Sequence, residues 1–440
     1  MSARRVRTPA VLWRRLRGRA IPILGAIALF CVYMGASLYI LPHMHHVRGW
    51  SYPLDLWNYF FLSRYIDIGN YQQLYGLTLG QTGLTTTPGA VVSLVPVWAI
   101  AHVAGIWVDL SAVPQPRPTA WLILGPYEVL LSAPALFAVD AVAVRIGASL
   151  ARRLVICAGE VYALYNVLLW GHPEDAVAVA LLVYSCLAAS DRRWLLSAWL
   201  LGVAIAFQPF VLLAMAPLFF PAGLRRLPGL LARAATPSAA LLVVPLALNW
   251  SVTVNSLVLQ PASLSGGRWT PWRHLAPSLA HFGPYGPNLV AGGPIRLVGV
   301  VFSLILGFWF CRARRDLRLL VAVVALTLMF RVVFESVIAP YYVFPTIALG
   351  LVSLSAASWR RSAAAVCIGA AVNWLSNFDG HRAWVWWPIV AGLAALVAVS
   401  WPKPVVLAGQ PHGRSSIERP SAQGEPPLGA AKFKRLSETQ

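Results

Sequence analysis

The sequence has few charged residues. Only 11% of its 440 residues are Asp, Glu, Lys or Arg, and 58% are hydrophobic. Soluble globular domains carry about 25% charged residues. A water-soluble protein of this size could not hide so much apolar surface. The composition therefore excludes an ordinary soluble domain and indicates a chain that lies in a lipid bilayer.

Acidic residues are the scarcer of the charged types. The chain has 15 Asp and Glu against 35 Lys and Arg, which gives a formal net charge of +20. The arginines stand in short clusters between apolar runs, as the positive-inside rule expects of cytoplasmic loops. Since no basic face interleaved with aromatic residues is present, the charge indicates membrane topology, and we expect no nucleic-acid partner.

Several catalytic and cofactor motifs are absent. The sequence has no P-loop, no dinucleotide-binding glycine pattern and no Ser-His-Asp spacing. No stretch is long and polar enough for the soluble nucleotide-binding domain that a nucleotide-sugar enzyme would need. The five cysteines stand in or beside apolar runs without short spacings, which argues against a disulfide framework or a metal cluster. We expect no metal and no other cofactor.

Apolar runs long enough to cross a bilayer, at about 20 residues each, recur through the chain. They lie near 21–41, 88–108, 120–144, 154–170, 174–190, 233–254, 295–312, 317–335, 338–357, 362–378 and 383–401. The stretch 194–221 is broken by Gln208-Pro209 and is either one tilted helix or two short ones. The prediction is an all-α, polytopic integral membrane protein with about 12–14 transmembrane helices over residues 21–401.

The segments outside the spans have distinct compositions. Residues 1–20 carry seven arginines and are predicted to be a basic cytoplasmic N-terminus before an uncleaved first span, because no small-residue cleavage site follows the long apolar run. Residues 402–440 are rich in Pro, Gly, Ser, Lys and Glu and are predicted to form a disordered cytoplasmic tail. Two long loops, 42–87 and 255–294, are predicted to face outward, the first with interfacial helices.

The arginine clusters give a partial topology. From Arg152 onward they alternate with uncharged or mixed loops, so that 171–175, 255–294, 335–340 and 376–382 face outward if 194–221 is a hairpin. The early spans conflict with this pattern. If 21–41, 88–108 and 120–144 each cross once, the Arg145–Arg153 cluster faces outward. Either one early segment is re-entrant or double, or this cluster breaks the rule.

Asp55 is the first candidate for chemistry. It follows the first span, in a loop of about 45 residues that is rich in Tyr, Trp and Gln and is too long and too aromatic for a simple connector. A carboxylate beside a membrane-spanning bundle is a candidate general base. The structural alternative is a helix N-cap, which Asp also favours. The residues alone leave both interpretations open.

A second candidate is the turn Trp170-Gly-His172-Pro-Glu174-Asp175, between two apolar runs. Three ionisable side chains within four residues are costly at a membrane edge and usually indicate a site. Helix capping is an alternative, because Pro suits the first helical position and Glu174 and Asp175 suit the positive end of the helix dipole. A metal site is the third alternative, but no further ligand stands at a fixed spacing.

The outer loop 255–294 is a third candidate. It contains Arg268, Trp269, Trp272, Arg273 and His274 among many glycines and prolines. Aromatic rings stack on sugar faces and arginine forks fit phosphate, which favours a binding loop. The alternative is an aromatic belt with basic contacts to lipid headgroups.

A fourth candidate is the segment from Arg331 to Pro345. Arg331 and Glu335 are four residues apart on one helix face and could simply pair. An arginine close to a membrane surface is equally suited to hold a lipid phosphate.

Taken in order, these residues resemble the GT-C-fold membrane glycosyltransferases that use polyprenyl-phosphate sugars, and most closely the actinobacterial mannosyltransferase-like branch. The features that carry the resemblance are Asp55, Tyr59, Gly69 and Tyr75 ahead of Thr87-Pro88 and Pro96, then Gly171-His172 and Asp175, and finally Pro340-Tyr341. The resemblance spans roughly residues 20–400. The sequence departs from the family in having His172 where Gln is commoner, and Gln208-Pro209 where Lys-Pro is commoner.

The resemblance implies a GT-C-like fold and an inverting sugar transfer, with mannose as the suggested sugar. The donor is a polyprenyl-phosphate sugar and the acceptor an envelope glycolipid or glycan, at the outer face of the plasma membrane. Asp55 would be the catalytic base, and Arg331, Arg268 and Arg273 would hold the donor phosphate. The expected substrate-binding residues are Tyr59, His172, Glu174, Asp175, His274 and Tyr341. The rival function is a transporter or flippase of lipid-linked sugars, which would need the arginines but no base, although no internal symmetry of two related halves is visible.

Overall fold

The structure is a computed structural model that describes residues 18–37, 53–67, 88–106, 118–248, 250–259, 262–263, 268–279, 289–312, 316–354, 357–378 and 383–402. Most of the predicted N-terminus, the predicted tail after Pro402 and much of the loop 42–87 lie outside these ranges. Gly69, Tyr75 and Thr87 lie outside them too.

The described residues are almost entirely helical, which confirms the all-α prediction. The longer helices are α2 (Ala20–Gly35), α4 (Leu54–Asp67), α6 (Pro88–Val103), α7 (Pro118–Arg145), α8 (Leu150–Leu169), α9 (Pro173–Ser190), α10 (Trp194–Phe207), α12 (Leu227–Leu248), α13 (Trp250–Leu259), α14 (Arg296–Arg312), α15 (Leu317–Val333), α16 (Phe344–Ser353), α17 (Trp359–Ser376) and α18 (Trp386–Ser400). Proline is the first residue of α6, α7 and α9, because proline suits the first helical turn.

Three of the described helices are long and apolar enough to cross a membrane, by length and composition. They are Leu122–Arg145 within α7, Pro173–Ser190 in α9 and Leu224–Leu248 around α12. Further helices are apolar but shorter, including α2, α6, α10 and α18. The helix content and these segments are compatible with a polytopic membrane protein.

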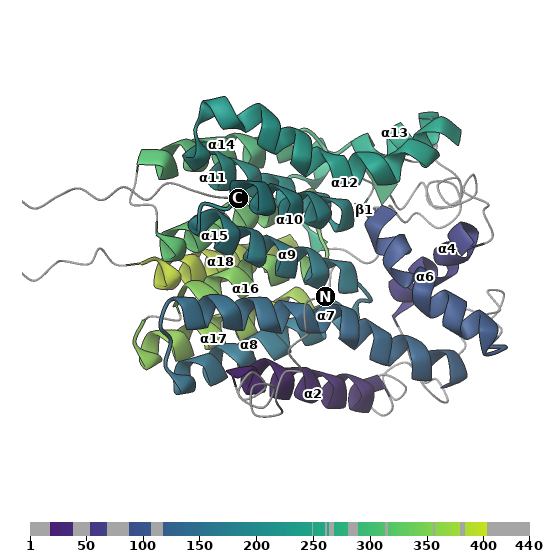
Figure 1. Ribbon diagram of the computed structural model, residues 1–440, viewed down its shortest axis with the longest axis horizontal. Helices are drawn as coiled ribbons and strands as arrows, with labels where there is room; N and C mark the ends of the chain where they lie inside the picture. The colour runs from purple at the N-terminus through teal and green to yellow at the C-terminus, as the bar shows by residue number, and fades with distance from the viewer. Residues whose placement is uncertain are drawn as a thin grey trace, which may run out of the picture. The chain divides into compact units, whose positions relative to one another are not determined.

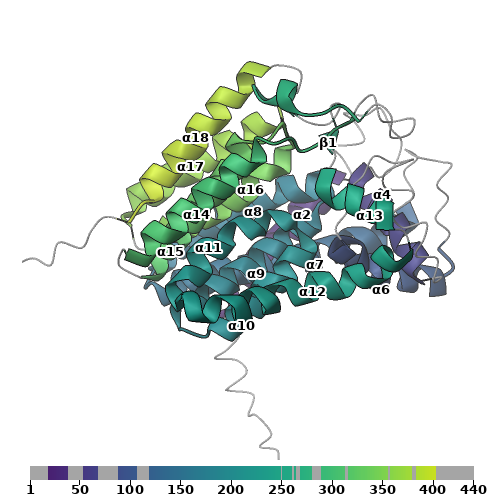
Figure 2. The same cartoon turned by 90° about the horizontal axis from the view of Figure 1, so that it is seen from above.

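The helices run back and forth between two ends of a bundle (Figures 1 and 2). At one end, Arg145 pairs with Asp191 at 2.6 Å, Arg318 donates to the Ile146 carbonyl at 3.3 Å and Arg152 donates to the Ala357 carbonyl at 3.0 Å. We call this the arginine-rich end, and it also holds Arg153, Arg192, Arg193, Arg225, Arg226, Arg360 and Arg361.

The opposite end carries the turn that contains His172, and we call it the histidine end. Three loops that are far apart in the sequence meet there. Asn166 donates from its amide nitrogen to the Pro340 carbonyl at 3.1 Å, and Asn377 donates to the Asn166 side chain at 2.7 Å. Trp170 donates to the Asn377 side chain at 2.8 Å. The described parts of the loops 171–175, 335–340 and 376–382 are therefore on one side of the bundle; that this side faces outward stays a prediction.

The stretch 194–221 is two segments rather than one tilted helix. α10 ends at Phe207, because the extended backbone of Gln208 and the proline that follows it break the helix. The chain returns to the arginine-rich end through η3 (Pro209–Ala214), α11 (Met215–Phe219), η4 (Phe220–Ala222) and η5 (Leu224–Arg226). α14 packs on this return segment, where the Ser303 hydroxyl donates to the Leu213 carbonyl.

α6 lies beside α4 rather than along the bundle. The rings of Phe60 on α4 and Trp98 on α6 have centroids 5.2 Å apart, and Gly89 packs against Ala206 at the C-terminal end of α10. Both views place α6 with α4 at the histidine end (Figures 1 and 2). α2 and α7 are then the early segments that run between the two ends. This arrangement is compatible with the alternative in which one early segment is re-entrant, and Arg145 and Arg153 lie at the arginine-rich end.

The loop 255–294 is anchored to the chain just after α15. The two-residue strand β2 (Arg268–Trp269) pairs with β4 (Val337–Ile338), and β1 (Ala262–Ser263) pairs with β3 (Leu289–Val290). The Thr270 hydroxyl donates to the carbonyls of Glu335 at 2.7 Å and Ser336 at 2.9 Å. Trp272 donates from its indole nitrogen to the Val333 carbonyl at 2.7 Å. These bonds hold the loop over the histidine end.

Candidate active site

The site begins with a close approach between α4 and the turn before α9. Gly171 has a φ of +73°, and a Cβ built on it would stand 2.6 Å from the Leu56 nitrogen and 2.7 Å from the Pro53 Cβ. Because glycine has no side chain and tolerates this backbone conformation, α4 can pack directly on the turn. This contact brings the first turn of α4, which contains Asp55, next to His172.

His172 is held between two carboxylates. Its Nε2 donates to Asp55 Oδ2 at 3.1 Å and its Nδ1 donates to Glu174 Oε1 at 2.7 Å. His172 and Glu174 are buried, whereas the Asp55 side chain keeps 30% of its exposure. Asp55 is therefore the member of this group that solvent or a substrate can reach.

The two carboxylates keep the imidazole charged. Burial alone would lower the pKa of His172, but the charges and hydrogen bonds of Glu174 and Asp55 outweigh it and raise the pKa from 6.5 to about 10. At neutral pH both ring nitrogens therefore carry protons and both donate. The imidazolium fixes the orientation of the Asp55 carboxylate and supplies a positive charge beside it.

Two tyrosines enclose the histidine ring. Tyr341 stacks on it with centroids 3.7 Å apart, and the Tyr59 ring meets it edge-on at 5.6 Å. The Tyr59 hydroxyl lies 3.3 Å from Nδ1. Burial, followed by the charge of Glu174, raises the pKa of Tyr59 well above 10, so its phenol stays protonated. Both predicted residues are therefore in the site.

Glu174 and Asp175 begin α9 and are buried. Gln208 donates from its amide nitrogen to Glu174 Oε1 at 3.2 Å, so this oxygen accepts from both Gln208 and His172. Both oxygens of Asp175 are buried without a hydrogen-bond partner among the described residues. Both carboxylates lie at the positive end of the α9 dipole, as the capping interpretation predicts. Glu174 also contacts the histidine, and the site interpretation stays a prediction.

Arg331 lies beside this cluster. Its guanidinium carbon is 4.4 Å from the ring centroid of Phe210 and 4.0 Å from that of Tyr342. Its Nε is 3.7 Å from Glu335, and its charge acts on Asp175. The Nη1 atom is buried and has no hydrogen-bond partner among the described residues. A buried N–H of a charged group requires an acceptor, so this atom is suited to an anionic ligand.

Glu335 pairs more closely with a different arginine. Arg296 donates from its Nε to Glu335 Oε2 at 2.6 Å, which is much shorter than the distance from Arg331. The pairing of Arg331 with Glu335 that the sequence allowed is therefore weak. Because Arg296 neutralises much of the Glu335 charge, Glu335 offsets less of the positive charge of Arg331.

The remaining predicted residues are farther from the histidine. The guanidinium of Arg273 stacks on Trp269 at 3.5 Å, and His274 is exposed. Neither has a contact with the histidine cluster among the described residues. Arg268 belongs to β2, but its side chain lies outside the described residues. The structure therefore brings together Asp55, Tyr59, His172, Glu174, Asp175, Tyr341 and Arg331.

The sequence interpretation missed Gln208, Arg296 and Tyr342. The sequence indicated Gln208 as a helix break and as a departure from the family pattern but not as a site residue, although a polar side chain before a proline in an apolar stretch is a usable signal. Arg296 begins an apolar run, so its pairing with Glu335 depends on how α14 and α15 pack. No protein-family model matches the chain, and no curated protein matches it.

Proposed function

We propose that this protein is a polytopic membrane glycosyltransferase. It transfers a sugar, with mannose our first choice, from a polyprenyl-phosphate donor to an envelope glycolipid or glycan, with inversion at the anomeric carbon. The observation that carries the proposal is the pairing of Asp55 with the charged His172 at the rim of a buried polar cluster. The resemblance to GT-C-fold enzymes, which rests in part on the same residues, is consistent with the proposal.

The helices that alternate between the two ends are proposed to cross the plasma membrane. By the positive-inside rule the arginine-rich end is cytoplasmic, together with both termini, and the histidine end faces outward. In this orientation α4 and α6 lie at the outer surface, as expected for interfacial helices in the first outer loop. The phosphate of a polyprenyl donor would lie at the same level as Asp55 and Arg331.

The chemical step requires a base and a cation. Asp55 accepts the proton of the acceptor hydroxyl while that oxygen attacks the anomeric carbon. The bond from the anomeric carbon to the phosphate oxygen breaks, and its electron pair leaves with the polyprenyl phosphate. The imidazolium of His172 holds the Asp55 carboxylate in position, which favours an in-line approach.

The leaving phosphate gains negative charge in this step. Arg331 is the best-placed cation, because its buried Nη1 lacks an acceptor among the described residues and its ring contacts fix the guanidinium. A fixed donor in a site of low polarity stabilises developing charge strongly. Since the leaving group is already a phosphate, no general acid is required.

The proposal is tested by Asp55→Asn, assayed in isolated membranes with labelled polyprenyl-phosphate mannose, arabinose and glucose in turn. We expect sugar transfer to fall by a factor on the order of 100 or more, with normal expression and folding, as for loss of a general base. The matched control is Asp191→Asn, which removes a carboxylate paired with Arg145 at the other end and should leave transfer unchanged. Unchanged transfer by Asp55→Asn would exclude Asp55 as the base.

The same assay separates the enzyme from its rival. A transporter or flippase of lipid-linked sugars would move the donor without breaking its glycosyl bond. Purified protein in detergent, with no gradient, should still transfer the sugar if the chain is an enzyme. Donor translocation by Asp55→Asn vesicles at the wild-type rate, with no sugar transferred by either protein, would instead establish the transporter.

A further inference from the structure

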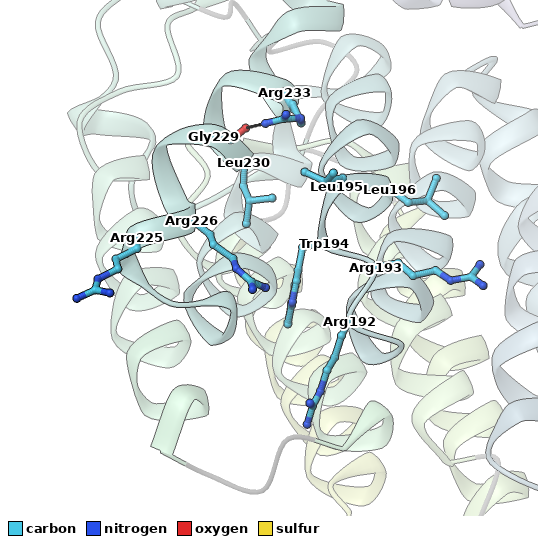
Figure 3. Close-up of a pocket in the computed structure, with 10 residues that line it drawn as sticks. All are labelled: Arg192, Arg193, Trp194, Leu195, Leu196, Arg225, Arg226, Gly229, Leu230 and Arg233. Carbon is cyan, nitrogen blue, oxygen red and sulfur yellow. Dashed lines mark hydrogen bonds between the residues drawn. The ribbon is translucent and has the colours of Figure 1, made fainter. Parts of the chain in front are cut away.

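The arginine-rich end contains a pocket that the proposed reaction does not use. It has a volume of about 780 Å³ and lies between the turn joining α9 to α10 and the start of α12. Its lining residues are Arg192, Arg193, Trp194, Leu195, Leu196, Arg225, Arg226, Gly229, Leu230 and Arg233 (Figure 3). A second hollow of about 630 Å³ shares Arg192, Trp194, Arg225 and Arg226 with it.

The positive charge of this pocket is not neutralised by its own walls. No acidic residue is among the lining residues. The nearest acid in the sequence, Asp191, pairs with Arg145 at 2.6 Å. The Arg233 guanidinium donates to the Gly229 carbonyl at 2.8 Å and has no acidic partner among the described residues. Five arginines around one hollow therefore favour an anionic ligand, and arginine forks fit phosphate oxygens particularly well.

Arg192 occupies this position at a conformational cost. Its φ is +59°, and it is the one non-glycine residue with a positive φ among the described residues. Glycine or asparagine would suit this helix C-terminal turn better than arginine. A strained residue at a pocket is a reason to look for a function of its side chain.

The other wall of the pocket is apolar and borders exposed helix surface. Leu195 and Leu196 are exposed, and in Figure 3 they lie on the opposite side of Trp194 from the Arg192 guanidinium. α12 begins at the pocket and is the most exposed of the three candidate spans. Only 17% of its apolar stretch is buried within the protein, against 56% and 72% for the other two. A ligand here would therefore meet arginines at one end and a lipid-facing helix at the other.

We propose that this pocket binds an anionic phospholipid, with the phosphate among Arg192, Arg225 and Arg226 and an acyl chain along Leu195 and Leu196. Basic pockets between helices at the cytoplasmic membrane surface are suited to such headgroups. The lipid would brace the return segment that ends at Arg226 against α10. The site is distinct from the sugar-transfer site, so either proposal can fail without the other.

The test uses purified full-length protein in detergent. Bound lipid is counted by native mass spectrometry during titration with phosphatidylglycerol and, separately, phosphatidylcholine. We expect phosphatidylglycerol to bind more tightly, and the double variant Arg225→Gln/Arg226→Gln to lose roughly 30-fold in that preference. Arg192→Gly should lose roughly fivefold while its melting temperature holds or rises, because glycine suits the backbone there. The second variant separates binding from folding.

The matched control is Arg360→Gln, which removes another exposed arginine of the same end but lies outside the pocket. It should bind phosphatidylglycerol like the wild type. The proposal is overturned if Arg360→Gln loses as much affinity as the pocket variants, or if the wild type binds both lipids equally. Displacement of phosphatidylglycerol by excess inorganic phosphate alone would also overturn it, because the pocket would then hold free phosphate rather than a lipid.

Discussion

Asp55 Oδ2 and His172 Nε2 lie 3.1 Å apart, although 117 positions separate the two residues in the chain. The contact joins the first turn of α4 to the turn that begins α9. Because the other ring nitrogen donates to Glu174, a single imidazolium links two acidic residues from separate helices. The pH response of the protein and the placement of α4 both depend on this arrangement.

The charged state of His172 predicts how stability changes with pH. Its pKa is about 10 in the folded protein and near 6.5 when unfolded. The stabilisation is therefore fully present below about pH 6.5 and is lost as the pH rises through about 10. We expect the melting temperature of the wild type to fall between pH 7 and pH 10.

The matched variant for this measurement is His172→Gln, because glutamine cannot titrate. It should be less stable than the wild type at pH 7, and its melting temperature should depend less on pH over the same interval. Parallel curves for the two proteins would contradict a titrating His172.

The ring contacts of Arg331 predict that lysine cannot replace it. Arg331→Lys keeps the charge but loses the planar contact with Phe210 and Tyr342 and the forked geometry. We expect the KM for the lipid-linked donor to rise by about tenfold, equivalent to roughly 1.4 kcal/mol of lost binding. Steady-state kinetics with the purified enzyme would measure it.

Arg312→Lys provides the comparison, because Arg312 also lies over a ring, that of Phe308 at 3.6 Å, but on α14, at its C-terminal end. Its KM should stay at the wild-type value. If both lysine variants behave alike, the effect is a general loss of packing and Arg331 has no special role toward the donor.

The close packing at Gly171 predicts that a larger residue there would misplace Asp55. Gly171→Ala would place a Cβ against the backbone of Leu56 and push α4, with Asp55, away from His172. Since displacement of a reacting group by about 1 Å can cost a factor on the order of 100, we expect transfer to fall at least tenfold. The measurement is the rate of sugar transfer, with circular dichroism as a check on folding.

Gly223→Ala is the control for backbone strain alone. Gly223 has a φ of +93°, but a Cβ there would meet nothing within 4 Å. It should lose about 1–3 kcal/mol of stability, because a φ of +93° with a ψ of 147° is a backbone conformation that essentially only glycine adopts, and it should keep its transfer activity. Equal losses of activity in the two alanine variants would mean that strain, rather than the displacement of Asp55, causes the defect.

Helix positions could be predicted well from the sequence where an apolar run has sharp boundaries. The expected 174–190 and 295–312 correspond to α9, Pro173–Ser190, and α14, Arg296–Arg312. Proline, arginine and acidic residues bound these runs and fix the ends. α6 was different, because its apolar composition indicates a span while its position beside α4 depends on long-range packing.

The site was predictable as a set of residue types but not as a set of contacts. Ionisable residues beside apolar runs directed attention to Asp55, His172 and Arg331. The partners that define their chemistry come from other helices, as Gln208 and Arg296 do. Periodicity and composition carry no information about which helix ends meet. The contacts of Gln208 and Arg296 can therefore be identified only from the three-dimensional structure.

The strand pairing of Arg268–Trp269 with Val337–Ile338 has a mechanical consequence. The chain on either side of it is tied to Glu335, through Thr270 on the loop and through Arg296 on α14. If the proposed polyprenyl donor enters beside this strand pair, any movement of the pair would also move the segment that follows Arg331. Entry of the proposed donor and the position of its phosphate-binding arginine would then be mechanically coupled.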